Sequence, residues 1–180
     1  MRWDRLFADL EAQLDAAAAD ELRAEVADRT RAELADVWLA DRLRAAVGAA
    51  VAVHLRGGEV VAGRVEDVGP EWVVLSDVRG QALVPLGAVG SVAGLPRRVA
   101  PPGGEVLRRL TLRSALRALV RDRAPVRLAL LGAELVGTLD RVAGDHVDVA
   151  LHPPGEPRRR EAVLEVRAVP LAALLVVRSA

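Results

Sequence analysis

The chain has 180 residues, of which 52% are hydrophobic, enough for one domain or two small ones with real cores. It contains no cysteine, which excludes disulfides and thiolate nucleophiles, and no apolar run approaches the ~20 residues of a membrane span, so we expect a cytoplasmic protein without a membrane partner. Its formal net charge of zero hides an acidic segment at residues 1–47, with 7 Arg against 11 Asp or Glu, and a basic one at residues 97–127, with 9 against 2.

The N-terminal segment predicts a long helical arm over residues 1–47. It has no glycine or proline between Trp3 and Val47, good helix formers dominate, and Gly48 marks the expected end. Large apolar side chains recur at helical spacing and are our candidates for self-association. They are Trp3, Leu6, Phe7, Leu10, Leu14 and, further along, Trp38.

From Val51 the apolar pattern changes from helical to alternating, which indicates strands. Residues 48–95 contain five short strand patterns, beginning with Val51, Val53 and Leu55 on one face and a Gly57-Gly58 turn. Five short strands in so few residues favour a small closed barrel, because closure removes the exposed hydrogen-bonding edges of a sheet.

Residues 96–125 read as a proline- and glycine-containing linker followed by a basic amphipathic helix over 107–120, which ends before Pro125. A second set of strand patterns then fills residues 126–180. It aligns with the first, so that Val84-Pro85-Leu86 matches Val169-Pro170-Leu171 and Trp72 matches His146. The second set differs by an inserted, arginine-tipped loop at residues 152–160.

The segment from Val51 to Val65, with its turn glycine Gly58 and second glycine Gly63, resembles the first motif of the Sm/LSm family of small SH3-type β-barrels, which includes bacterial Hfq. The second set keeps this pattern through Gly132 and Gly137. The resemblance implies an α+β fold. We therefore expect two Sm-like five-stranded antiparallel β-barrels, each preceded by a helix, behind the long helical N-terminal arm.

Members of this family bind single-stranded RNA on rings of barrels, so the resemblance implies RNA binding. At the positions where the family has an acidic residue and an asparagine in its nucleotide pocket, this sequence has Gly69 and Val73, and Ala143 and Val147 in the second set. The sequence therefore lacks that pocket.

The basic segment is the strongest nucleic-acid signal, because a row of arginines on one helical face can follow a phosphate backbone. The alternative is that these arginines pair with the acidic arm, within the chain or between subunits. The candidate nucleic-acid-binding residues are Arg108, Arg109, Arg113, Arg117, Arg121, Arg158, Arg159 and Arg160.

No pattern predicts an enzyme, a cofactor or a metal site. Asp145, His146, Asp148 and His152 form the one cluster of metal-ligand types, but alternation along a strand places Asp145 on the face opposite His146 and Asp148. Trp72 begins a strand, where packing in a core or interface is favoured over stacking on a base.

Three functional hypotheses remain. The first is a non-enzymatic, oligomerising adaptor or regulator, a homo-oligomer or a binder of a protein partner. The second is an RNA- or DNA-binding regulator that uses the arginine-rich helix and loop. A ribosome-associated factor is a minor third.

Overall fold

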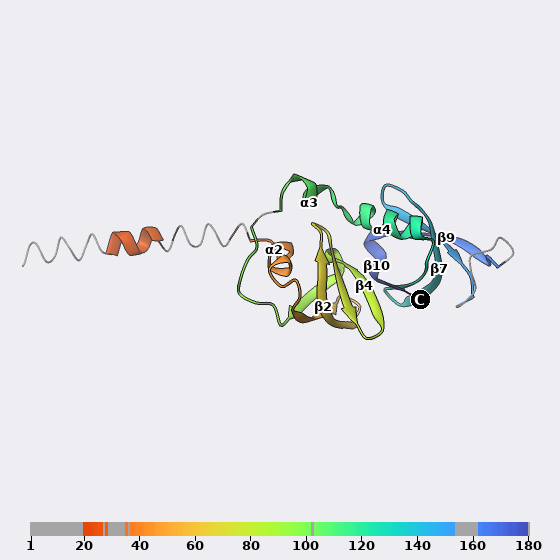
Figure 1. The fold of residues 1–180 in the computed structure, drawn as a ribbon, viewed down its shortest axis with the longest axis horizontal. Helices are drawn as coiled ribbons and strands as arrows, with labels where there is room; N and C mark the ends of the chain where they lie inside the picture. The colour runs from red at the N-terminus through yellow and green to blue at the C-terminus, as the bar shows by residue number, and fades with distance from the viewer. Residues whose placement is uncertain are drawn as a thin grey trace, which may run out of the picture. The chain divides into compact units, whose positions relative to one another are not determined.

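The fold is that of a computed structural model, which describes residues 20–26, 28, 35, 37–101, 103–153 and 162–179. The chain divides into two units, residues 1–38 and residues 39–180. In the first unit, residues 20–26, 28 and 35 are helical. The described part of the second unit is mainly β-structure with short helices (Figure 1).

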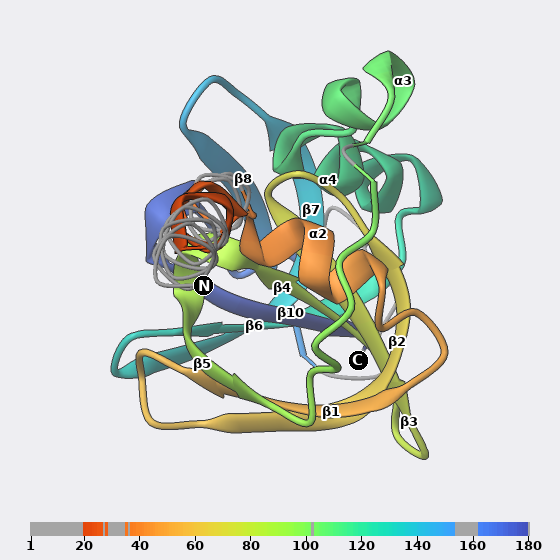
Figure 2. The ribbon, with the colours of Figure 1, turned by 90° about the vertical axis from the view of Figure 1, so that its left-hand side faces the viewer.

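The second unit begins with a helix and a first strand set. These elements are α2 (Leu39–Arg44), β1 (Ala50–Leu55), β2 (Val60–Val68), β3 (Trp72–Asp77), β4 (Gly80–Pro85), the 3-10 helix η1 (Leu86–Ala88) and β5 (Val89–Ala93). Side chains on β1 alternate between buried and more exposed, with Val51, Val53 and Leu55 buried, as the sequence pattern predicted. Figure 2 views this set, with α2 packed against β2 and β3.

Two helices and a second strand set follow. They are α3 (Glu105–Arg109), α4 (Leu112–Asp122), β6 (Pro125–Leu130), β7 (Ala133–Val142), β8 (His146–Leu151), β9 (Glu165–Pro170), the 3-10 helix η2 (Leu171–Ala173) and β10 (Leu174–Ser179). Helix α4 packs against β7.

The prediction of two closed barrels is wrong. All ten strands form one open antiparallel sheet in the order β5-β1-β2-β3-β4-β10-β6-β7-β8-β9. Closing the first set would require β4 to pair with β5, but β4 pairs with β10 instead, with Leu83 opposite Val177 and Ala82 opposite Arg178. The edge of β4, which closure of the barrel would have paired with β5, is therefore paired in part with β10 of the second strand set.

The prediction of a long helical arm to residue 47 is also wrong. Val37 and Trp38 are not helical, and α2 is a separate helix of 6 residues. The break falls at Val37 and Trp38, a β-branched and a bulky aromatic residue, which are weaker helix formers than the Leu39 and Ala40 that begin α2. Packing against the core holds this segment in place, because three of its side chains are buried there: Ala40, Leu43 and Ala46. In the part of the chain that the structure describes, no helix has both the length and the apolarity needed to cross a membrane.

The two hydrophobic cores interlock where β4 meets β10. The first core contains residues of α2 and β1 to β4, together with Leu175 and Val176 of β10. The second contains residues of α4 and β6 to β10, together with Trp72 and Leu83 of the first set. Each core is therefore completed by side chains from the other strand set, and the two sets make one folding unit.

The strand sets correspond in their irregularities as well as their order. The ladder between β2 and β3 shifts between Val65 and Asp67, and that between β7 and β8 shifts between Leu139 and Arg141. In the fifth strand of each set one residue has no partner across the ladder, Gly90 in β5 and Leu175 in β10. Bulges bend a strand and fix its register, so the sets share their geometry.

Two glycines at matching places explain how the strands approach so closely. A Cβ atom at Gly63 would lie 2.6 Å from the carbonyl oxygen of Ser76, and one at Gly137 would lie 2.2 Å from that of Ala150. Any other residue would have to displace the neighbouring strand. Glycine is therefore strongly favoured at both positions.

Candidate interaction surfaces

Helix α4 is shorter than predicted because a cap interrupts the expected helix over 107–120. Thr111 is the N-cap of α4, and its hydroxyl accepts a hydrogen bond from the Ser114 N–H at 3.3 Å. Two residues of the first strand set also form hydrogen bonds with the backbone at the start of α4. The Glu71 carboxylate accepts from the Leu112 N–H at 2.8 Å, and Trp72 Nε1 donates to the Leu110 carbonyl at 2.8 Å. A carboxylate at a helix N-terminus also interacts favourably with the helix dipole.

The contacts of Trp72 agree with packing rather than with an exposed stacking platform. Its side chain is buried in the second core, and Gly69 lies directly against the ring, since a Cβ there would come within 2.4 Å of Trp72. Its one polar atom is already bonded to Leu110. The ring therefore connects the first strand set to α4.

Helix α4 presents three candidate arginines to solvent. Arg113, Arg117 and Arg121 are exposed and spaced four residues apart, while Leu112 and Leu116 on the opposite face are buried. We call these three the arginine stripe. Like charges four residues apart on a helix repel each other by about 0.2–0.5 kcal/mol per pair. Among the described residues, none of the three makes an ion pair, so the stripe is available for an anionic partner.

Of the other candidate arginines, the structure describes the side chain of Arg109 alone. Arg109 lies on α3, beyond the break at Thr111, and is paired with Glu105 of the same helix. Arg108 is also in α3, but its side chain is outside the described part. Arg158, Arg159 and Arg160 lie outside the described residues altogether.

Most of the predicted self-association residues also lie outside the described residues. These are Trp3, Leu6, Phe7, Leu10 and Leu14. Trp38 is described, and 75% of it is exposed.

An apolar groove of about 430 Å³ runs between α4 and the strands around the junction of β4 and β10. Trp72, Leu83, Leu119 and Val177 line it, and Arg121 of the stripe lies on the same groove. The last arginine of the stripe is thus next to apolar surface as well as solvent.

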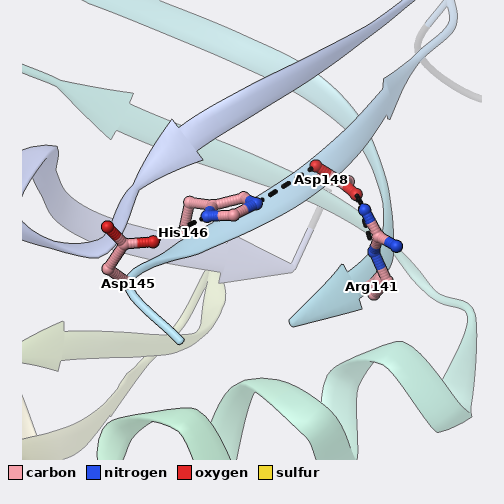
Figure 3. Close-up of polar contacts among 4 residues, drawn as sticks. All are labelled: Arg141, Asp145, His146 and Asp148. Carbon is pink, nitrogen blue, oxygen red and sulfur yellow. Dashed lines mark hydrogen bonds and ion pairs between the residues drawn. The ribbon is translucent and has the colours of Figure 1, made fainter. Parts of the chain in front are cut away.

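A polar cluster covers the start of β8 (Figure 3). His146 Nδ1 lies 2.7 Å from an Asp145 carboxylate oxygen, and Arg141 Nε donates to Asp148 at 3.0 Å. The hydrogen bond from His146, and then its charge, lower the pKa of Asp145 below its usual value. The expectation that Asp145 points away from His146 is wrong, because Asp145 precedes the strand and is not bound by its alternation.

His152 is a packed core histidine. It is 3% exposed and Thr138 is 1% exposed, and Thr138 Oγ1 lies 2.9 Å from His152 Nε2. The other ring nitrogen, Nδ1, lies 3.1 Å from the Pro153 carbonyl. Both nitrogens are satisfied within the fold. No group of three or more metal-ligand side chains occurs among the described residues.

The two ends of the sheet are the feature that the sequence prediction missed. Within the described residues, β5 pairs only with β1 and β9 only with β8, so each leaves one edge without a neighbouring strand. Gly90, Ser91 and Ala93 of β5 are exposed, as are Val166 and Ala168 of β9. The edge of β5 also lacks the charges and proline that commonly protect an edge strand.

Inside the molecule, an edge of the same kind is already paired with another strand, where β4 meets β10. This internal seam consists of the pairs Leu83–Val177 and Ala82–Arg178, and the Arg178 guanidinium lies 2.9 Å from the Glu59 carboxylate. The chain thus contains one contact of this kind between its two strand sets, and two strand edges that have no paired strand among the described residues.

Comparison of the chain with protein-family models, with curated proteins and with solved structures finds no match.

Proposed function

We propose that the protein is a non-enzymatic adaptor or regulator that self-associates through the open edges of its sheet. The supporting observation is that β5 and β9 are exposed at the two ends of one continuous sheet. An exposed edge offers a row of backbone N–H and C=O groups to another strand, and strand addition is a common mode of protein recognition. A cytoplasmic location is part of the proposal, and fractionation of expressing cells tests it.

Proline substitutions in β9 test this proposal, because successive N–H groups of a strand point to opposite sides. The two variants are Arg167→Pro and Ala168→Pro. One of them loses an N–H group that faces β8, and its folding stability should fall. In the other, the lost N–H faces the free edge, and stability is retained while self-association is lost. Light scattering measures association, and urea unfolding measures stability. Full association by stable forms of both single variants contradicts self-association through the β9 edge.

A second candidate function is binding of RNA or DNA by the arginine stripe. Its supporting observation is the spacing and exposure of Arg113, Arg117 and Arg121. The triple substitution of these residues to Gln should remove binding to a mixed RNA pool and lower its salt dependence, because fewer phosphate counterions are released.

A matched control removes three exposed arginines elsewhere, Arg56, Arg79 and Arg97, and leaves the stripe intact. This control has the same net charge as the stripe variant. Equal loss of RNA binding in the two variants would show that net charge, and not the stripe, is responsible. No binding by the unaltered protein at low salt contradicts this second function.

A further inference from the structure

We propose that the apolar groove beside α4 binds a straight-chain carboxylate of medium length, with its carboxylate on Arg121 and its hydrocarbon chain across the internal seam. This site goes beyond the proposed self-association, because none of its lining residues belongs to β5 or β9. Helix α4 and strand β10, which both line the groove, are labelled in Figure 1. The site and the proposed function can therefore fail separately.

The floor of the groove contains a row of side chains that crosses neighbouring strands. Asp67 of β2 lies opposite Val74 of β3, and Val74 lies opposite Leu83 of β4. The row continues across the internal seam to Val177 of β10. Neighbouring strands lie about 4.8 Å apart, so the row is about 14 Å long. It is apolar except at Asp67, its end in the first strand set.

The opposite wall is a face of α4 with small side chains. Ser114, Ala115 and Ala118 line the groove from this helix, whereas Leu112 and Leu116 are buried in the second core. Because alanine and serine reach less far from a helix than leucine does, the space between helix and sheet is not filled there. The hollow of about 430 Å³ lies within the range of about 300–1,000 Å³ that is usual for small-molecule sites.

The two ends of the groove carry opposite charges. Helix α4 begins at the first strand set, where Glu71 accepts a hydrogen bond from the Leu112 N–H, and it ends just before β6 of the second set. Arg121 is in the last turn of α4, about 14 Å from Leu112 along the helix axis at 1.5 Å per residue. Arg121 therefore lies at the end of the groove in the second set, and Asp67 lies at the end in the first.

Arg121 is the positive charge that a ligand can neutralise. Its side chain is exposed and makes no ion pair among the described residues. Arg178 also lines the groove, but its guanidinium is 2.9 Å from the Glu59 carboxylate. A guanidinium matches a carboxylate with two parallel N–H groups. Because Asp67 repels a carboxylate from the other end, the charges also orient the ligand.

The lining between the two ends favours a hydrocarbon chain. The Trp72 indole and the Ser114 hydroxyl both donate to backbone carbonyls, so they are not free to bind a polar ligand. Gln81 and Ser179 also line the groove and are exposed to solvent. Hydrocarbon gains free energy by leaving water, whereas a polar group without a partner loses it. The apolar contacts come mainly from Val74, Leu83, Leu119 and Val177.

Isothermal titration calorimetry of the full chain with sodium salts of straight-chain acids tests the site. Affinity should rise from hexanoate to octanoate to decanoate by up to about 4-fold for each added CH₂, the gain from burying one such group. Octan-1-ol has the same chain length as octanoate but no charge. It should bind about 10-fold more weakly, because it lacks the charge-assisted hydrogen bonds to Arg121.

Two arginine variants of α4 locate the carboxylate. Arg121→Gln should lower the affinity for octanoate about 10-fold and leave that for octan-1-ol nearly unchanged. The matched control is Arg117→Gln, which removes the same charge one turn earlier, from an exposed side chain that does not line the groove. It should leave both affinities unchanged. Ala118→Leu fills the hollow and should weaken binding of both compounds, and urea unfolding checks that each variant is folded.

The outcomes separate this inference from the proposed function. No detectable binding of decanoate at concentrations up to about 1 mM overturns the site. Equal affinities for octanoate and octan-1-ol, or equal losses in Arg121→Gln and Arg117→Gln, overturn the carboxylate on Arg121 and with it the class of ligand. Light scattering of the same protein without ligand reports self-association, so failure of the site leaves the proposed function standing.

Discussion

The substitution Gly137→Ala should destabilise the fold strongly, because the new Cβ has no room. It would lie 2.2 Å from the Ala150 carbonyl oxygen, 2.9 Å from the carbonyl carbon and 3.1 Å from Leu151 Cα, whereas ordinary contacts begin at 3.4 Å. Strands β7 and β8 would have to separate by about 1 Å, and such overpacking costs about 1–3 kcal/mol. The loss of unfolded-state entropy returns about 0.4–1 kcal/mol.

Gly144 provides a matched control in the turn between β7 and β8. It is exposed, and a Cβ there has nothing within 4 Å. Gly144→Ala should therefore leave stability unchanged or raise it slightly. In urea unfolding, the two variants should differ by about 2 kcal/mol, or about 1 M in midpoint for a slope of ~2 kcal/mol/M.

Gly63→Ala provides a graded comparison, because its Cβ would lie 2.6 Å from the Ser76 carbonyl oxygen. Its cost should fall between those of Gly137→Ala and Gly144→Ala. Equal midpoints for the Gly137 and Gly144 variants would refute the close strand approach and with it this account of the glycine positions.

Three further predictions concern single side chains. Trp72→Phe should lower the free energy of unfolding by about 1–2 kcal/mol, because the indole N–H that it removes donates to the Leu110 carbonyl ahead of α4. Trp38 is exposed, so the control Trp38→Phe should have no measurable effect on urea unfolding. Arg123→Gly should raise stability by about 0.5–1 kcal/mol in the same assay, because Arg123 caps α4 at a φ of 50° that favours glycine; unchanged stability contradicts this. The pKa of Asp145 is lowered by His146, so its contribution to stability is present above the usual aspartate pKa of about 4 and is lost as pH falls through the lowered value. The stability difference between the natural protein and Asp145→Asn should therefore shrink in unfolding curves recorded at successively lower pH below 4, and a difference that grows there contradicts the assignment.

The strand positions could be predicted because they depend on local pattern. Alternating burial in β1 follows directly from Val51, Val53 and Leu55, and the turn glycine Gly58 has the positive φ of 86° that a glycine is needed for. These signals lie within a few residues of each other. They indicate which segments form strands, but they do not say which strand lies beside which.

The continuous sheet could not be predicted from the same signals, because it depends on contacts between distant residues. One local sign was present. Leu174 to Val177 are all buried, and such an unbroken apolar run is typical of a strand covered on both faces. The corresponding residues of β5 include Gly90 and Ser91, so β10 has the character of a central strand and β5 that of an edge.

The arginine stripe was only partly predictable. The spacing of four residues predicts that Arg109, Arg113 and Arg117 share one face of a continuous helix. In the structure Arg113 and Arg117 lie on α4, whereas Arg109 lies on α3. The cap at Thr111 and the contact from Glu71, 41 residues earlier, end that continuity. Thr111 is a common N-cap residue and was a usable sign, whereas the contact from Glu71 is tertiary and invisible in the local sequence.

Sedimentation velocity of the full chain over a range of about 1–100 µM tests the central claim, self-association through the sheet edges, most directly. We predict species heavier than one 19.1 kDa copy, increasing with concentration and reverting on dilution, as expected for reversible association through the open edges of the sheet. A single species of one copy at every concentration would contradict it.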